Sequence, residues 1–169
     1  MRKRCETMNL LGPEHFKIAF DTKKCSAKFS GLANTNVPKL YVVVAGGEVV
    51  YVGKAQRPMR ERFYGGWNAS GKHGYHGYAW RHTHTEAEVF VWYQQGDSPD
   101  GLVDLETLEA EVVFLVRCAG QWPCGQTEIH FHPSGEKHRA LAAQILRRLS
   151  DHHDLKSSSG NSVVTTAGA

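Results

Sequence analysis

The pattern of apolar and polar residues predicts several strands. Residues 40–44 and 49–52 are rich in β-branched and aromatic side chains, and Gly46-Gly47 between them is typical of a β-hairpin turn. Residues 88–93 predict a third strand, and apolar residues that alternate over 16–20 indicate a short earlier one.

A helix is predicted where apolar residues recur at helical spacing. Leu105, Leu108, Val112 and Leu115 follow one another at intervals of three or four residues, which predicts a core-facing helix over 103–118.

Other segments complete the predicted organisation. Pro58 is suited to the first turn of a helix, and the glycine-rich residues 65–77 predict a long irregular loop. Residues 135–149 predict a second amphipathic helix.

The order of these elements predicts a small α+β domain with a mainly antiparallel three-stranded sheet flanked by helices, because a short hairpin loop cannot form a parallel crossover. We assign residues 1–38 to an N-terminal extension packed on the core and 39–155 to the domain. Residues 156–169, rich in Ser, Gly, Thr and Ala, predict a disordered tail.

Composition narrows the function classes. The chain is 41% hydrophobic and 22% charged, and no apolar run approaches bilayer length, so we expect a cytoplasmic protein with no membrane partner and with its four cysteines as free thiols. Residues 1–66 carry 12 Lys and Arg against 5 Asp and Glu. This basic part suits a polyanion, although a solvated charged surface has the same composition.

Four short motifs occur in a fixed order. Lys39-Leu40-Tyr41 comes first and Tyr51-Val52-Gly53-Lys54-Ala55 begins ten residues after Tyr41; Met59-Arg60-Glu61-Arg62-Phe63 and Glu111-Val112-Val113-Phe114-Leu115 follow. Their order and spacing resemble the GIY-YIG endonuclease family over roughly residues 39–120, and the second motif is similar to the excision-repair nuclease branch. Lys39 departs from the family glycine. For the family's late asparagine, either Gln126 is the substitute or the role is missing.

The resemblance implies a catalytic set of Tyr41, Tyr51, Arg62 and Glu111, with Gly53 and Lys54 in support. It implies that the tyrosines activate water, that Arg62, or else Arg60, pairs with phosphate, and that Glu111, or else Glu109, holds Mg²⁺ or Mn²⁺. A carboxylate suits these ions because they prefer oxygen ligands. A tyrosine of ordinary pKa, about 10, needs nearby cations to serve as a base.

Aromatic and basic residues interleave between Trp67 and His84, as in surfaces that stack on bases and hold phosphate. The alternative is a loop that folds over the sheet edge and buries its aromatic rings. The candidate nucleic-acid contacts are Lys54, Arg57, Arg60, Lys72, His73, His76, Trp80 and Arg81.

These features predict a metal-dependent endonuclease with DNA as its expected substrate. The alternative is a noncatalytic nucleic-acid-binding or adaptor module that retains the fold. A third hypothesis is a zinc-stabilised interaction domain, with the ligands Cys118, Cys124, His130 and His132.

The hairpin makes a geometric prediction, because strand side chains alternate between faces. If Tyr41 and Tyr51 share one site as direct cross-strand partners, the turn must be the three residues 45–47. A two-residue turn at Gly46-Gly47 would place the tyrosines on opposite faces unless a bulge intervened.

Overall fold

The computed structural model describes residues 8–20, 25–68, 76–96, 100–123, 126 and 131–159. Its strands and helices are β1 (Asn9–Phe20), β2 (Cys25–Ala27), η1 (Gly31–Asn34), β3 (Lys39–Ala45), β4 (Glu48–Ala55), α1 (Met59–Asn68), η2 (His76–His82), β5 (Glu86–Gln95), α2 (Gly101–Cys118) and α3 (Glu136–Ser159).

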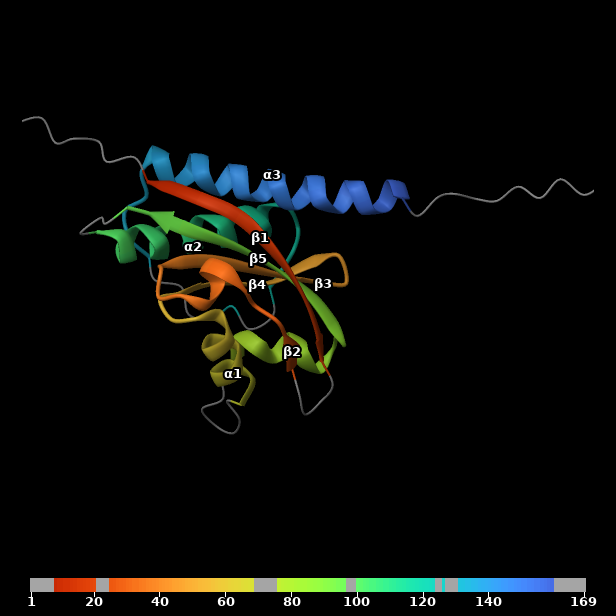
Figure 1. The fold of residues 1–169 in the computed structure, drawn as a ribbon. Coiled ribbons are helices and arrows are strands. Elements are labelled where there is room, and N and C mark those ends of the chain that lie inside the picture. The colour runs from red at the N-terminus through yellow and green to blue at the C-terminus, as the bar shows by residue number, and fades with distance from the viewer. Residues whose placement is uncertain are drawn as a thin grey trace, which may run out of the picture.

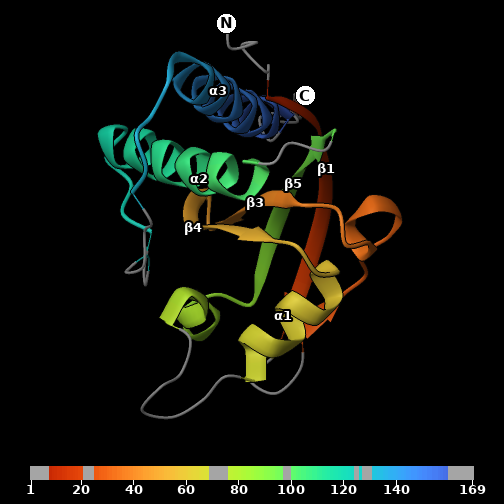
Figure 2. The same cartoon turned by 90° about the vertical axis from the view of Figure 1, so that its left-hand side faces the viewer.

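Four long strands and the three-residue β2 form one antiparallel sheet in the order β2-β1-β5-β3-β4. The helices α2 and α3 cover one face of this sheet, and α1 with the 3₁₀ helix η2 lies on the other side (Figures 1 and 2). The protein therefore has three layers, and the β3–β4 hairpin has helices on both sides.

Each face of the sheet has its own apolar core, because successive side chains of a strand point to opposite faces. Leu40 and Val42 of β3 pack with α2 and α3, whereas Tyr41 and Val43 pack with α1, η1 and η2. All seven residues of β3 are buried, as expected for a strand between two layers.

The predicted α+β class is confirmed, but the predicted number of three strands is wrong. The additional long strand is β1, which pairs with β5 over most of its length and with the short β2 on its other side. Only residues 16–20 of this strand carry an alternating pattern, and β1 also contains a bulge between Leu11 and Glu14. The region assigned to an N-terminal extension thus contributes two strands to the sheet.

The helices extend beyond their predicted ranges. Helix α1 continues through Gly65 and Gly66 to Asn68, so the predicted irregular loop begins later than residue 65. Helix α3 runs from Glu136 to Ser159, past the predicted start of the tail at residue 156, and residues 160–169 lie outside the described part. Predictions from local composition therefore ended both helices too early.

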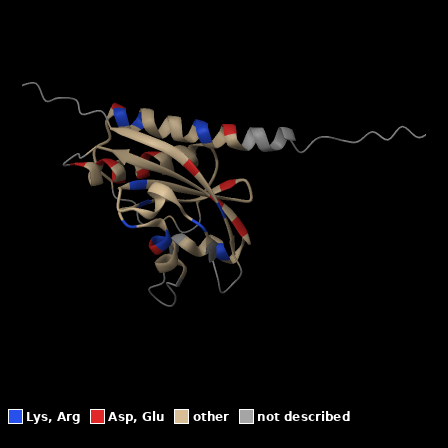
Figure 3. Ribbon diagram, viewed as in Figure 1, with Lys and Arg blue, Asp and Glu red and all other residues tan. Residues whose placement is uncertain are grey.

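Acidic side chains gather on α2, which carries Asp104, Glu106, Glu109 and Glu111 (Figure 3). Glu109 is buried and Glu111 is only half-buried, so neighbouring carboxylates on this helix have different environments.

Among the described residues, no helix has both the length and the apolar character needed to cross a bilayer.

Two leucines of α2 test the packing of this helix on the sheet. Leu108 is 0% exposed and Leu102 is 42% exposed. Leu108→Ala should lower the free energy of unfolding by about 2–5 kcal/mol because it leaves a cavity. Leu102→Ala should change it by less than about 0.5 kcal/mol. Urea denaturation of both variants measures this difference, and equal losses would contradict the packing described above.

Candidate functional site

A bulge in β4 sets the orientation of the two hairpin tyrosines. The turn has two residues, Gly46 and Gly47, with φ of 59° and 84°, and Ala45 pairs with Glu48. The expected three-residue turn with Tyr41 opposite Tyr51 is therefore wrong. The register shifts by one residue between the Val44–Val49 and Val43–Tyr51 pairs, which leaves Val50 as the extra residue.

This bulge places Tyr51 on the same face as Tyr41. Tyr51 pairs with Val43, and Val43 lies two residues from Tyr41 on that face. The ring centroids of the tyrosines are 5.7 Å apart. The two residues meet as diagonal neighbours rather than as direct partners.

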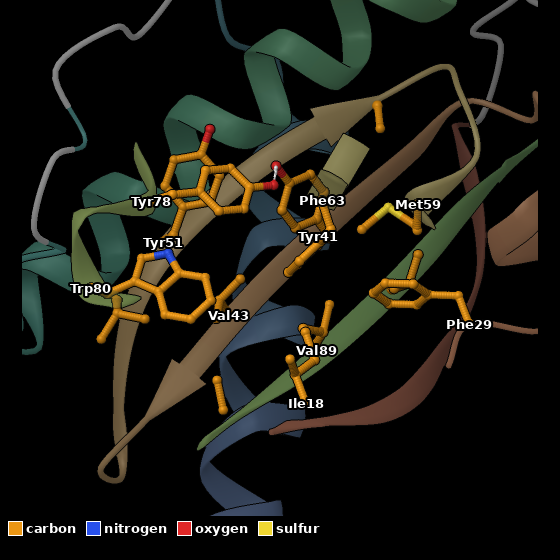
Figure 4. Close-up of a cluster of buried hydrophobic side chains, with 14 of the residues drawn as sticks. Ile18, Phe29, Tyr41, Val43, Tyr51, Met59, Phe63, Tyr78, Trp80 and Val89 are labelled. Atoms are coloured by element: carbon orange, nitrogen blue, oxygen red, sulfur yellow. Dashed lines mark hydrogen bonds between the residues drawn. The ribbon is translucent and has the colours of Figure 1, made fainter. Parts of the chain in front are cut away.

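Tyr78 of η2 completes a buried tyrosine cluster with Tyr41 and Tyr51 (Figure 4). Its hydroxyl lies 3.3 Å from that of Tyr41, at hydrogen-bonding distance, and its ring centroid is 5.8 Å from that of Tyr51. The sequence analysis did not single out Tyr78 as a site residue, since it lies 37 positions from Tyr41 and belongs to none of the motifs.

Gly53 makes room for the cluster. Gly53 is the direct cross-strand partner of Tyr41, and a Cβ atom placed on it would lie 2.8 Å from the Tyr41 hydroxyl and 2.6 Å from the Tyr51 ring. No side chain can occupy this position without displacing an aromatic ring. The Tyr51-Val52-Gly53 motif therefore requires glycine at position 53, because the rings of Tyr41 and Tyr51 lie so close to its backbone.

Arg62 approaches the cluster from α1. Its Nε donates a hydrogen bond of 3.2 Å to the hydroxyl oxygen of Tyr41. Arg60, the second choice from the sequence, is exposed. Arg62 therefore joins the candidate site, and Arg60 lies on the outer surface of α1.

Glu109 brings a carboxylate from the opposite layer. It lies on α2, is 8% exposed, and its Oε1 is 3.5 Å from Nε2 of Gln126. Burial raises the pKa of Glu109 to about 7, while the positive charges of Lys54 and Arg62 act to lower it. This carboxyl group is therefore within electrostatic range of both cations at the β4 edge.

Gln126 links this carboxylate to the hairpin. Its Oε1 accepts a 3.0 Å hydrogen bond from the backbone N–H of Val52, and its own carbonyl oxygen accepts one of 3.3 Å from Nη2 of Arg117. The candidate counterpart of the family asparagine thus contacts Glu109 and strand β4. Thr127, its neighbour, lies outside the described residues.

The structure favours Glu109 over Glu111 as the site carboxylate. The sequence analysis preferred Glu111 on motif spacing, but Glu111 is half-buried and lies outside the group formed by Glu109, Gln126 and Lys54. Two residues along a helix correspond to a turn of about 200°, so the two glutamates cannot face the same strand edge.

Lys54 already has an acidic partner. Its Nζ forms an ion pair with Oε1 of Glu106, whose other oxygen lies 2.6 Å from Nε2 of His132. Burial lowers the pKa of Lys54, and the charge of Glu109 partly opposes this shift. Lys54 is thus part of a network at the site, and the motif spacing did not predict Glu106 as its partner.

Lys39, at the position where the resemblance would place a glycine, has a structural role. Its side chain is completely buried, and its ammonium donates to the carbonyl oxygens of Thr35 at 2.7 Å and Arg57 at 3.2 Å. Burial lowers the pKa of Lys39 to about 8. Lys39 thus links the segment before β3 to the segment after β4 by hydrogen bonds. This link holds the residues just before α1 in place.

The predicted nucleic-acid contacts divide into three groups. Arg57, like Arg60, is exposed, whereas Lys72, His73 and the side chain of His76 lie outside the described residues. Trp80 is 1% exposed and packs against Phe20, so its predicted stacking on bases is incompatible with this structure.

Arg81 also differs from its predicted role. Its Nη1 donates to the carbonyl oxygens of Gly66, at 3.2 Å, and of Trp67, and its guanidinium lies 5.6 Å from the Trp67 ring centroid. Arg81 therefore binds the last carbonyls of α1, where a helix favours a positive charge. This part of the segment corresponds to the alternative of a loop with buried aromatic rings.

Only two of the four predicted zinc ligands lie within the described residues. Cys118 is exposed and His132 binds Glu106, while Cys124 and His130 lie outside the described residues.

Comparisons with protein-family models, with curated proteins and with solved structures find no match to this chain. The interpretation of the site therefore depends on the geometry of the chain itself.

Two adjacent glycines of α1 test the packing of Tyr78. A Cβ on Gly66 would lie 2.5 Å from the Tyr78 ring, whereas one on Gly65 would meet no atom within 4 Å. The steric overlap in Gly66→Ala should lower the free energy of unfolding by about 1–3 kcal/mol, and the higher helix propensity of alanine should offset part of this loss. Gly65→Ala should raise it by up to about 1 kcal/mol.

Thermal denaturation and near-ultraviolet circular dichroism measure both effects, since Tyr78 lies beside Trp80 with ring centroids 5.8 Å apart. Unchanged aromatic signals in Gly66→Ala would contradict the described contact.

The buried carboxyl of Glu109 should make stability depend on pH. Its folded-state pKa of about 7 exceeds the ordinary 4.5, so the folded protein binds the extra proton between these values. This proton stabilises the folded state. The stabilisation is fully present below about pH 4.5 and is lost as the pH rises through 7, which lowers the free energy of unfolding by about 3 kcal/mol.

Glu109→Gln should remove this component. Urea denaturation of the wild type and the variant at pH 5 and pH 8, with a chelator present, isolates it as the difference between the two proteins. Identical pH dependence in both would show that Glu109 titrates normally.

Proposed function

We propose that the protein is a divalent-metal-dependent endonuclease of the GIY-YIG type that hydrolyses phosphodiester bonds, with DNA as its expected substrate. The observation that carries this proposal is that Arg62, which is hydrogen-bonded to Tyr41, lies within electrostatic range of the buried Glu109 carboxylate. These residues come from α1, β3 and α2, and the antiparallel sheet with helices on both faces supports the same assignment.

Glu109 suits the role of metal ligand. It is a buried carboxyl group whose nearest described hydrogen-bond donor, Gln126, is 3.5 Å away, and its raised pKa reflects burial without full compensation. A divalent cation would favour its ionised form, and magnesium prefers oxygen ligands. When bound, the metal would stabilise the charge that develops on the phosphate.

Arg62 and the tyrosines provide the remaining chemistry. The planar guanidinium can pair with phosphate oxygens, and one of the two hairpin tyrosines, ionised with the help of the nearby cations, can take a proton from the attacking water as the bond from phosphorus to the leaving sugar oxygen breaks. Tyr41 is fully buried and its hydroxyl contacts Arg62 and Tyr78, so an attacking water could reach it only after a local rearrangement of these side chains.

A noncatalytic nucleic-acid-binding module with the same fold is the second candidate. The observation that favours it is the ion pair between Lys54 and Glu106, which neutralises a cation that the family resemblance assigns to the active site.

Cleavage of supercoiled plasmid in Mg²⁺ or Mn²⁺ tests the proposal, with Glu109→Gln as the diagnostic variant and Glu111→Gln as its matched control on the same helix. The wild type and Glu111→Gln should nick or linearise the plasmid. Glu109→Gln should be slower by at least about a hundredfold, because a metal ligand contributes several kcal/mol to transition-state stabilisation.

Two results would redirect the interpretation. Salt-sensitive plasmid binding by the wild type without cleavage would favour the binding module. Loss of cleavage in Glu111→Gln with full activity in Glu109→Gln would overturn the choice of carboxylate.

A further inference from the structure

A second group of potential ligands lies on the face of the sheet that α2 and α3 cover. His15 of β1, Glu88 of β5 and His152 of α3 each bring one ligand atom to a common point, and these atoms all lie within 4.8 Å of one another. The tyrosine cluster occupies the opposite face, so this group is separate from the candidate active site.

The fold itself brings the three residues together. His15 is the direct cross-strand partner of Phe90, and Glu88 lies two residues before Phe90, so both side chains share the face beneath α3. His152 follows the buried Leu149 by three residues, which places it on the sheet-facing side of α3.

Phe90 fixes the orientation of both imidazoles. The His15 ring stacks on it at a centroid distance of 4.7 Å and an interplanar angle of 13°, and the His152 ring meets it edge-on at 4.9 Å. Rings held by packing lose little freedom when they bind a ligand, so the arrangement is preorganised.

The distances match those of a tetrahedral metal site. Bonds of 2.0–2.2 Å to zinc place adjacent ligand atoms about 3.3 Å apart. Oε2 of Glu88 lies 3.4 Å from Nε2 of His15 and 3.0 Å from Nε2 of His152. These two separations are within about 0.3 Å of that length, and all three ligand atoms lie within 4.8 Å of one another.

We infer that His15, Glu88 and His152 form a zinc site that fastens α3 to the sheet. Two imidazoles with one carboxylate suit zinc and similar transition metals, whereas magnesium favours oxygen ligands alone. Three protein ligands leave the fourth position to water. The side chains of His15 and His152 are 30% and 27% exposed, so an ion can approach the group from solvent.

Metal titration of the chelator-treated full chain tests the site. With excess Mg²⁺ present to occupy the proposed site at Glu109, Co²⁺ should bind with one ion per chain and produce visible absorption bands typical of a four- or five-coordinate site, and Zn²⁺ should displace it. Zn²⁺ should also raise the melting temperature. Glu88→Gln and His152→Ala should each weaken binding at least about tenfold, because even partners outside the first coordination sphere contribute that much.

His132→Ala is the matched control. His132 also binds a glutamate, Glu106 at 2.6 Å, but the partner that completes that group is Lys54 rather than a second histidine. This variant should bind Co²⁺ as the wild type does, and so should Glu109→Gln, which separates the zinc site from the proposed nuclease site.

Three results would overturn the inference: no stoichiometric Co²⁺ or Zn²⁺ after dialysis, unchanged affinity in Glu88→Gln, or loss of the visible bands in His132→Ala. Circular dichroism without metal establishes that the variants fold. If His152→Ala fails to fold, Glu88→Gln decides the question, because glutamine retains the size of the side chain. Plasmid cleavage in Mg²⁺ is not a readout of this site.

Discussion

The single extra residue in β4 is the constraint on which the candidate site depends. A two-residue Gly46-Gly47 turn fixes the start of the hairpin and, without the bulge at Val50, would direct Tyr51 toward α2 and α3. The bulge reverses the face of every later residue in the strand, because side chains alternate. Gly53 then lies opposite Tyr41, where the absence of a side chain leaves room for the rings of Tyr41 and Tyr51.

The edge of β4 connects the two helical layers. An edge strand presents unpaired backbone groups, and here side-chain amides bind them: Gln121 accepts from the N–H of Val49 at 2.8 Å and Gln126 from that of Val52. Gln126 also approaches Glu109, so the group that protects the edge positions the carboxylate. Residues on opposite faces of a sheet can share a site only around such an edge.

Sequence patterns predicted the hairpin, the third strand and helix α2, because these depend on local periodicity, whereas the group of Tyr41, Tyr51 and Arg62 was implied by the family resemblance. Sequence patterns missed the length of β1, whose pattern is interrupted by a bulge. They also missed that Tyr78 belongs to the tyrosine cluster, which depends on tertiary packing. The choice between Glu109 and Glu111 also required the structure, since both flank the same apolar stripe.

The pairing of β1 with β5 joins segments about 75 positions apart in the chain, and such distant contacts slow folding because long loops must close first. During synthesis the hairpin emerges before β5, α2 and Gln126. A nascent chain can therefore contain both hairpin tyrosines while it still lacks the carboxylate and the glutamine at the β4 edge. The complete site exists only after most of the chain has left the ribosome, so the order of synthesis itself delays the assembly of its parts.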